Sequence, residues 1–267
     1  MPEPMSAEPV DVALTPVLLY HDVTRGVPDS PWQINVGELA AHLDEVAACG
    51  RTVLDATALD AALADGCAPP SPLCAVTFDD GYASFTELAL PLLRERHLPA
   101  TLYVTTDYLE RPGMLSRGAV RDLLDEPVEI GAHAVHHVHL DLYRAAAGSQ
   151  VRDCRAELAG LLGRAPASFA YPHGSFDRTV RDAVERAGYT NAYAVKNAFT
   201  HIADDRYARA RLTVVAATDR RTVGRWLAGR GAARSWRGER LRTTAYRQVR
   251  AARERLAQRG PALGRRP

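Results

Sequence analysis

Residues 76–82 read VTFDDGY, an apolar run that ends in two adjacent carboxylates and a glycine. Side chains on a strand alternate between its two faces, so neighbouring aspartates can share one site only where the strand ends and the backbone turns. Gly81 tolerates the backbone angles that such a turn needs. In this arrangement one carboxylate can bind a metal ion while the other acts as a base. A plain Asp-Asp-Gly surface turn is the alternative that this segment alone leaves open.

Apolar runs and helical repeats alternate along the chain on both sides of this segment. Strands are predicted at 15–20, 74–78, 100–105, 128–132, 169–171 and 191–195, and helices at 36–49, 84–96, 120–124, 152–162 and 178–187. Such alternation indicates a parallel sheet. Polar residues follow the predicted strands, as they do at the carboxyl ends of strands in β/α barrels. We therefore predict an α/β fold, a (β/α) barrel of about seven units, in preference to an open doubly wound sheet.

The composition is that of a globular protein with one unusual end. Of the 267 residues, 46% are hydrophobic and 24% are charged, which is ordinary for a soluble protein. Residues 229–267 hold twelve Arg and two Glu, a net charge of +10, although the whole chain carries only +1. We predict a flexible segment at 1–14, a barrel domain at 15–228 and an Arg-rich, helical or partly disordered tail at 229–267.

Within this tail, apolar residues recur at helical spacing from 234 to 259, which predicts an amphipathic helix with a dense basic face. Such a helix can lie on anionic lipid or bind a protein partner, and a solvated or partly disordered end is the alternative. No nucleic-acid-binding motif accompanies it, so binding of nucleic acid is not expected. The oligomeric state is not indicated by the sequence.

The start of the chain has no basic stretch followed by an apolar one and so does not resemble a secretory signal. No run approaches the ~18 apolar residues of a membrane-spanning helix. We therefore expect a cytoplasmic protein, with peripheral membrane contact through the tail left open. The four cysteines lack the spacing of a zinc cluster or a disulfide framework, so reduced thiols are expected at Cys49, Cys67, Cys74 and Cys154.

Residues 131–140, GAHAVHHVHL, place four histidines directly after a predicted strand. His133 and His137 are four residues apart, so both imidazoles would project from one face if the segment formed a helical turn. Two imidazoles and one carboxylate are a common zinc shell that leaves a position for water. His136 and His139 could instead be solvated loop residues.

Taken together, these motifs resemble those of the polysaccharide deacetylases of carbohydrate esterase family 4, which share the NodB-homology domain. The likeness rests on TFDDGY at 77–82, LPATLYV at 98–104, GAHAVHH at 131–137 and FAYPHG at 169–174, and it covers roughly residues 16–227. It implies a distorted (β/α) barrel. The implied reaction is hydrolysis of the N-acetyl group of an N-acetylhexosamine in a glycan, glycolipid or sugar metabolite, with release of acetate.

The resemblance also implies roles for individual residues. One divalent metal ion, most often zinc in this family, would be held by Asp80, His133 and His137. Asp79 would be the general base that takes a proton from the attacking water. Tyr171 and His173 would contact the oxyanion and the substrate, His173 through its backbone N–H, and core packing is the alternative for Tyr171.

Two departures from the family pattern move roles to other parts of the chain. Ala170 stands where the family usually has an Arg that orients the base. Arg211 resembles the displaced Arg of a sub-branch whose members begin with a Tyr-His-Asp segment, here residues 20–22. No Leu-x-x-His motif occurs near the C-terminus, so His21 is the candidate general acid, with Asp22 available to orient it.

Both reassigned residues have a structural alternative. His21 could be a capping residue in the loop after the first strand. Arg211 could alternate with Arg206 and Arg209 toward solvent on an edge strand. Trp32, Trp226 and Trp236 could stack on a sugar face, and packing is the alternative for each.

Three functions remain open from the sequence. The first is the metal-dependent amidohydrolase described above. The second is an O-acetyl esterase that uses the same site, because esters and amides pass through similar tetrahedral intermediates. The third is a carbohydrate-binding barrel that has lost activity, which the missing Arg at Ala170 motivates. The presence of all three metal ligands and of the base favours an enzyme.

Overall fold

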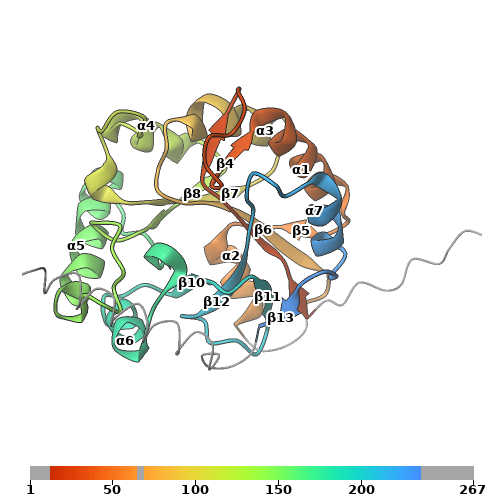
Figure 1. Cartoon of the computed structure of the whole chain (residues 1–267). Helices are drawn as coiled ribbons and strands as arrows, with labels where there is room; N and C mark the ends of the chain where they lie inside the picture. Colours follow the sequence, from red (N-terminus) through yellow and green to blue (C-terminus); the bar gives the residue numbers. More distant parts are fainter. Residues whose placement is uncertain (1–12, 65–68, 236–267) are drawn as a thin grey trace, which may run out of the picture. The chain divides into compact units, whose positions relative to one another are not determined.

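The computed structural model describes residues 13–64 and 69–235 (Figure 1). Within these residues, seven parallel strands form a closed barrel in the order β2-β12-β10-β9-β8-β7-β6. They are β2 (Val17–Tyr20), β6 (Leu73–Phe78), β7 (Ala100–Val104), β8 (Val128–Ala132), β9 (Ser168–Ala170), β10 (Asn191–Val195) and β12 (Arg209–Thr213). Closure is complete because β2 pairs with both β6 and β12. The predicted barrel is therefore confirmed, and an open doubly wound sheet is excluded.

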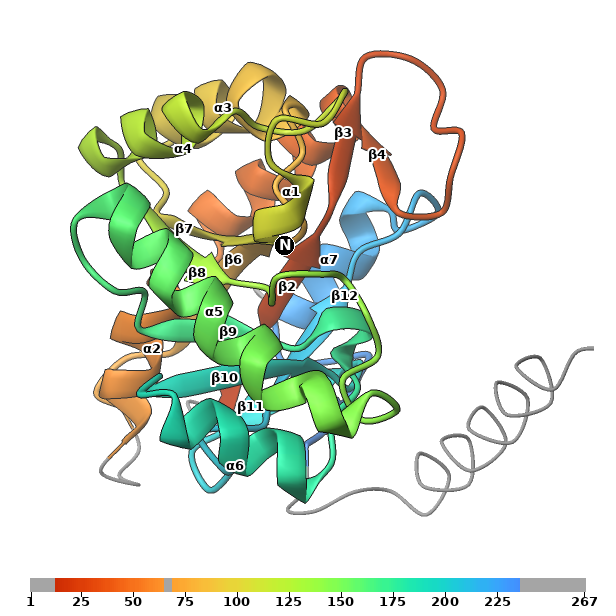
Figure 2. The same cartoon turned by 90° about the vertical axis from the view of Figure 1, so that its left-hand side faces the viewer.

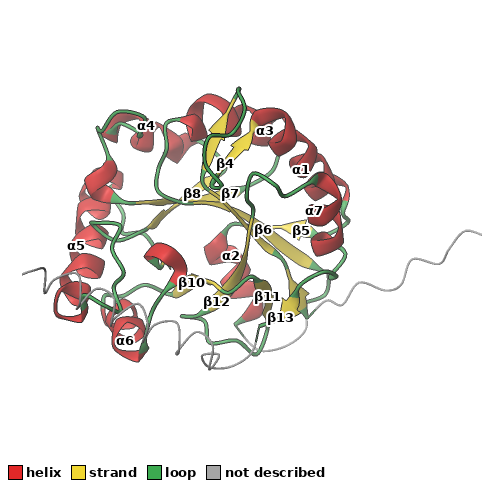
Figure 3. Cartoon of the chain, viewed as in Figure 1, coloured by secondary structure: helices red, strands yellow, loops and turns green. Residues whose placement is uncertain are grey.

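Helices surround the barrel on its outer face (Figure 3). They are α1 (Val36–Ala48), α3 (Leu90–Glu95), α4 (Arg117–Asp122), α5 (Arg144–Leu162), α6 (Arg178–Arg186) and α7 (Arg220–Leu227). A π-helical turn, η1 (Phe85–Ala89), precedes α3, and a 3-10 turn, η3 (Leu123–Asp125), follows α4. Helix α5 begins well before the predicted residue 152, because its first turns carry few of the apolar side chains on which the periodicity depends.

Helix α2 (Ala56–Leu63), which the sequence patterns did not indicate, closes one end of the barrel. Asp55 caps it by accepting a hydrogen bond from the backbone N–H of Ala58. Its apolar side chains pack on inward-facing residues of the strands, and this cluster comprises Val17, Ala56, Leu59, Leu63, Leu73, Ala75, Tyr103, Ala170 and Tyr193. Figure 1 shows α2 inside the ring of outer helices.

Polar contacts fix this helix in place. Asp60 on α2 is 1% exposed and forms a buried ion pair with Arg209 of β12 at 2.7 Å, which the half-exposed Arg206 joins. The Tyr193 hydroxyl donates to the carbonyl of Ala56. An isolated buried charge would be costly, so the carboxylate and the guanidinium hold the helix and the strand together.

Short strands complete the described part. A small sheet contains β1 (Leu14–Thr15), β11 (Ala198–His201) and β13 (Ala233–Arg234), and β5 (Thr52–Val53) pairs with the start of β6. A parallel pair, β3 (Asp22–Thr24) and β4 (Gln33–Asn35), follows β2. The remaining 3-10 turns are η2 (Thr106–Tyr108) and η4 (Pro172–Gly174).

These strands change the predicted end of the barrel domain. One compact unit reaches Ser235, and Arg234 lies in β13 rather than at the start of a helix. The rest of the predicted tail helix, most of the segment 1–14 and Cys67 lie outside the described residues. In the described part, no helix has the length and hydropathy to cross a membrane, and the thiols of Cys49, Cys74 and Cys154 are free.

Candidate metal and catalytic site

The two aspartates of the opening motif turn into one buried site at the carboxyl end of β6. The N–H of Asp79 still donates to the carbonyl of Tyr20 on β2 at 3.0 Å, as a continuation of the strand pairing. Asp80 and Gly81 then both have left-handed backbone angles, φ 76° and 91°. A left-handed aspartate is uncommon and is found where local structure enforces it. This double turn leaves Asp79 and Asp80 2% and 6% exposed, side by side.

The predicted metal ligands come together at this point. One ligand atom each from Asp80, His133 and His137 lies within 4.8 Å of the others. The Nε2 atoms of His133 and His137 are 3.5 and 3.4 Å from Oδ1 of Asp80. The helical turn that was to bring the imidazoles together is absent, because Ala134 has φ 65° and residues 133–137 form no helix.

The donor set fits a divalent cation. Oδ1 of Asp80 is buried without a hydrogen-bond partner, which is costly unless a cation satisfies it. His133 Nδ1 donates to the carbonyl of Ala170 at 2.8 Å, so its Nε2 keeps a lone pair directed toward Asp80. In the sequence, Ala170 stands out only because the family usually has an Arg at this position. No side-chain pattern indicates the role of its backbone carbonyl.

The pKa shifts favour cation binding. Burial lowers the pKa of His133 to about 4, and burial together with His133 lowers that of His137 to about 3, so both imidazoles are neutral and can act as ligands at neutral pH. Burial and the neighbouring charge of Asp79 raise the pKa of Asp80 to about 7. A cation at this position would favour the ionised carboxylate.

Asp79 is held by an arginine from another strand. Arg211 of β12, fully buried, donates from Nη1 and Nη2 to the two carboxylate oxygens of Asp79, each at 2.7 Å. Nη1 also reaches the Thr77 hydroxyl at 3.3 Å. Burial alone would raise the pKa of Asp79, but Arg211 brings it down to about 2. The solvent-facing alternative for Arg211 and Arg209 is wrong, because β12 is paired on both sides and both side chains are buried.

His21 follows β2, and its ring lies within reach of the charges of Asp79 and Arg211. Its Nδ1 is buried without a hydrogen-bond partner, and its ring centroid is 5.3 Å from that of Trp32. Burial lowers the pKa of His21, and the charge of Asp79 opposes this shift. Asp22 does not orient His21, because its carboxylate instead accepts hydrogen bonds from Ser84 and Gln33, both at 2.6 Å.

The turn after β9 carries Tyr171 and His173, the two residues predicted to contact the oxyanion and the substrate, and it places them differently. Tyr171 is fully buried, and its hydroxyl and backbone N–H donate to the carbonyls of Tyr207 and Tyr193. Both of its donors therefore serve the fold, which agrees with core packing of Tyr171 rather than with the predicted oxyanion or substrate contact. His173 has φ 56° and is exposed, with its ring centroid 4.2 Å from that of His137.

Gly174 makes this tight turn sterically feasible. Its φ is 66°, and a Cβ there would lie 2.4 Å from the backbone nitrogen of Val195. Any other residue would push η4 away from β10. The turn thereby keeps His173 beside His137, one of the candidate metal ligands.

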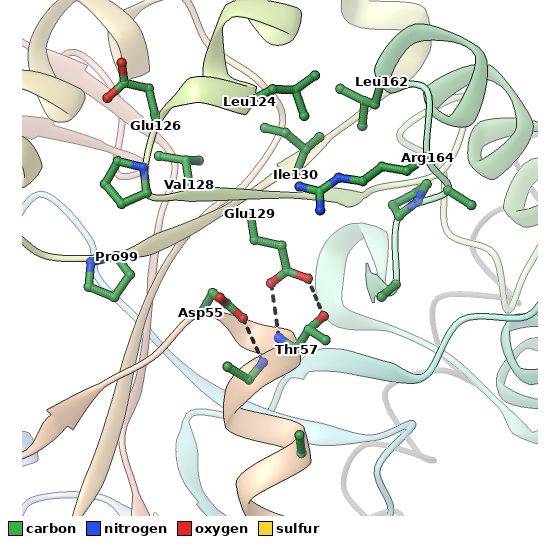
Figure 4. A pocket seen from close by; sticks show the side chains of 16 residues that line it. Asp55, Thr57, Pro99, Leu124, Glu126, Val128, Glu129, Ile130, Leu162 and Arg164 are labelled. Carbon is green, nitrogen blue, oxygen red and sulfur yellow. Dashed lines mark hydrogen bonds between the residues drawn. The ribbon is translucent and has the colours of Figure 1, made fainter.

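A separate cavity of about 590 Å³ lies at the other end of the barrel (Figure 4). Its lining includes residues that precede β7, β8 and β9, whereas Asp79, His133 and Tyr171 follow their strands. Glu129 faces it and accepts hydrogen bonds from the backbone N–H and the hydroxyl of Thr57. The cavity therefore does not include the candidate metal ligands Asp80, His133 and His137.

The fold and the site define a (β/α)-barrel protein with an acid–histidine cluster at the carboxyl ends of its strands. Residues 67–192 match the family model of the polysaccharide deacetylases.

A curated relative from Bacillus subtilis (strain 168) bears the name "Putative polysaccharide deacetylase YxkH". It is 22% identical over 178 residues, which span 66% of this chain and 63% of the relative. Less than two thirds of the relative's length is therefore matched.

Two solved structures are similar in fold. Streptococcus pyogenes deacetylase PplD, solved in complex with acetate, superposes with a TM-score of 0.73 at 19% identity, covering 79% of this chain and 96% of that one. IcaB from Ammonifex degensii gives a TM-score of 0.70 at 24% identity, covering 81% of this chain and 97% of that one. At these identities the likeness concerns the fold.

Proposed function

We propose that this protein hydrolyses the N-acetyl group of an N-acetylhexosamine in a glycan, glycolipid or sugar metabolite and releases acetate. The observation that carries the proposal is the ionised, Arg-bound Asp79 immediately beside the Asp80, His133 and His137 group. The match of residues 67–192 to the polysaccharide deacetylase family model supports a carbohydrate substrate. Asp79 is thus ionised and can accept a proton, while Asp80 faces two neutral imidazoles.

Asp80, His133 and His137 would hold one divalent cation, and two imidazoles with one carboxylate are a donor set typical of zinc. A cation bound there would polarise the acetyl carbonyl and lower the pKa of a water molecule. The chain's own contribution is to fix the donors: the Ala170 carbonyl sets the tautomer of His133.

Asp79 accepts the proton of the water that attacks the acetyl carbonyl. Two parallel hydrogen bonds from Arg211 fix the plane of the carboxylate and keep it ionised, so no rotation precedes the transfer. Arg211 is therefore a positioning residue in this proposal.

Two further groups act on the tetrahedral intermediate. The backbone N–H of His173, in the turn beside His137, stabilises the oxyanion. His21 gives a proton to the departing nitrogen, so that the carbon–nitrogen bond breaks to leave a free amine and acetate. The unpartnered Nδ1 of His21 and its place beside Asp79 support this role.

The test is acetate release from N-acetylglucosamine oligomers by the zinc-loaded protein and by Asp79→Asn. We expect the variant to lose about 100-fold to 10,000-fold in kcat, because proton transfer by a positioned base contributes about that much. The exposed Asp44, paired with Arg96, supplies a control, Asp44→Asn, that should retain full activity.

Unchanged acetate release by Asp79→Asn would show that Asp79 is not the base. Turnover of an acetyl ester compared with that of an acetamide on the same sugar separates N-deacetylation from O-deacetylation. A preference for the ester would contradict the proposed amide substrate.

A further inference from the structure

One exposed aromatic side chain lies next to the proposed catalytic groups. Trp32 is 51% exposed, although large apolar side chains are usually buried. It belongs to residues 25–32, which connect β3 to β4, and Figure 2 shows this connection projecting from the barrel. Within the described residues its indole makes no hydrogen bond, and its ring contact is with His21. Its exposure therefore has no evident structural reason.

The connection that carries Trp32 is anchored on several sides. The carbonyl of Pro31, the residue before it, accepts a hydrogen bond from the N–H of Ala216 at 2.9 Å. Gln33, the residue after it, donates from Nε2 to Asp22 at 2.6 Å and pairs with it across β3 and β4. Asn35 donates to the carbonyl of Gly26 at 2.8 Å. The backbone of Trp32 is thus held in place before any ligand arrives, which reduces the entropy lost on binding.

Trp32 is also positioned relative to the reacting groups. Its ring is tilted by 51° against that of His21, at a centroid distance of 5.3 Å. His21 in turn lies close enough to Asp79 for the two charges to interact. A molecule that covers the free part of the indole would therefore lie beside the proposed general acid.

We propose that Trp32 is a stacking platform for the pyranose ring of the substrate; this inference rests on the proposed function. A pyranose with equatorial substituents, such as N-acetylglucosamine, presents a flat face of C–H groups that packs on an indole, while its hydroxyl groups stay in water. An aromatic side chain offers a large apolar area at small entropic cost, which suits such a partly hydrated ligand. Contact with the sugar at Trp32 holds the ring while its acetamido group is hydrolysed.

The first measurement is binding, which does not depend on turnover. Calorimetry with a tetramer of N-acetylglucosamine on the zinc-loaded Asp79→Asn protein gives a reference Kd. Adding Trp32→Ala should weaken binding about tenfold, whereas Trp32→Tyr should stay within about threefold, because a tyrosine ring keeps the stacking face. Val27→Ala, on the same connection and 92% exposed, is the matched control and should leave Kd unchanged.

The second measurement is kinetic. In the active protein, Trp32→Ala should raise KM for the tetramer about tenfold, with most of the loss in kcat/KM carried by KM, and Trp32→Tyr should restore it. The thermal unfolding temperature should be the same for Trp32→Ala, Trp32→Tyr and Val27→Ala. Equal values would show that the loss of affinity comes from lost stacking and not from a disturbed β3–β4 connection.

Each outcome separates this inference from the proposed function. Equal Kd for the Trp32→Ala and reference proteins, or no binding by the reference protein, would overturn the platform even if acetate is released. Trp32-dependent binding without acetate release from any acetylated sugar would support the platform and overturn the proposed deacetylation.

Discussion

At the scale of single residues, the pairing of Asp79 with Arg211 decides how the site can work. Removing one member of a buried, hydrogen-bonded ion pair leaves an uncompensated charge, whereas an exposed pair contributes little. The two parallel hydrogen bonds also fix the direction of the carboxylate, which an ammonium group cannot do in the same way. The orientation of Asp79, and much of its ionisation, therefore depend on Arg211.

We expect Arg211→Lys to reduce kcat about 10-fold to 100-fold, because the charge remains while the two-point contact with Asp79 is lost. The matched control is Arg209→Lys in the same strand, equally buried but paired with Asp60 at the other end of the barrel. Steady-state acetate release and chemical denaturation are measured for both. The control should lose stability and keep its kcat, and equal kcat losses in the two variants would argue against a specific role for Arg211.

The residues of the candidate metal site could be predicted from the sequence to a useful extent. Adjacent aspartates and a histidine pair after predicted strands indicated one site, because parallel strands end on the same side of a barrel. Three details could not be predicted. The left-handed Ala134, the bonding of Asp22 and the hydrogen-bond partners of the two Tyr171 donors depend on neighbours that are distant in sequence.

At the scale of secondary-structure elements, α2 shows what periodicity misses. Its sequence, ATALDAAL, is short and carries a charged residue on the face that becomes buried. Only the closed barrel, with Arg209 pointing inward, makes Asp60 acceptable in the core. A tertiary partner on β12 therefore overrides the local pattern.

Asp60→Asn should destabilise the protein by about 3–5 kcal/mol, because it leaves Arg209 buried without a counter-charge. The comparison is Asp44→Asn, which breaks an exposed pair and should cost at most about 1 kcal/mol. The free energy of unfolding from urea titration measures both. Similar losses for the two variants would mean that the ion pair does not hold α2.

At the scale of the whole molecule, binding of a cation would link the site to the stability of the barrel. The candidate ligands come from the turn after β6 and from the segment after β8, which lie far apart in the sequence and meet only in the folded chain. A cation that binds only the folded state stabilises it by mass action.

Zinc at about 100 times its Kd should add about 2.7 kcal/mol and raise Tm by about 5–10 °C over the chelator-treated protein. His137→Ala should abolish this increase. His136→Ala is the control, because that imidazole is an exposed neighbour paired with Asp107 and should leave the increase intact. Calorimetric scans with and without zinc measure Tm, and an increase that survives in His137→Ala would place the ion elsewhere.

Because helix α2 closes one end of the barrel, it also limits how a ligand can reach the candidate site. Within the described residues, side chains of α2 and the pairing of Asp60 with Arg209 fill one end of the barrel, so the proposed catalytic groups face the opposite rim, which carries Trp32 and His173. Under the proposed function, sugar, water and acetate would then share the entrance at this rim. Acetate formed beside Asp79 would leave by the route along which the next substrate arrives, so departure of product and arrival of substrate would compete for the same space.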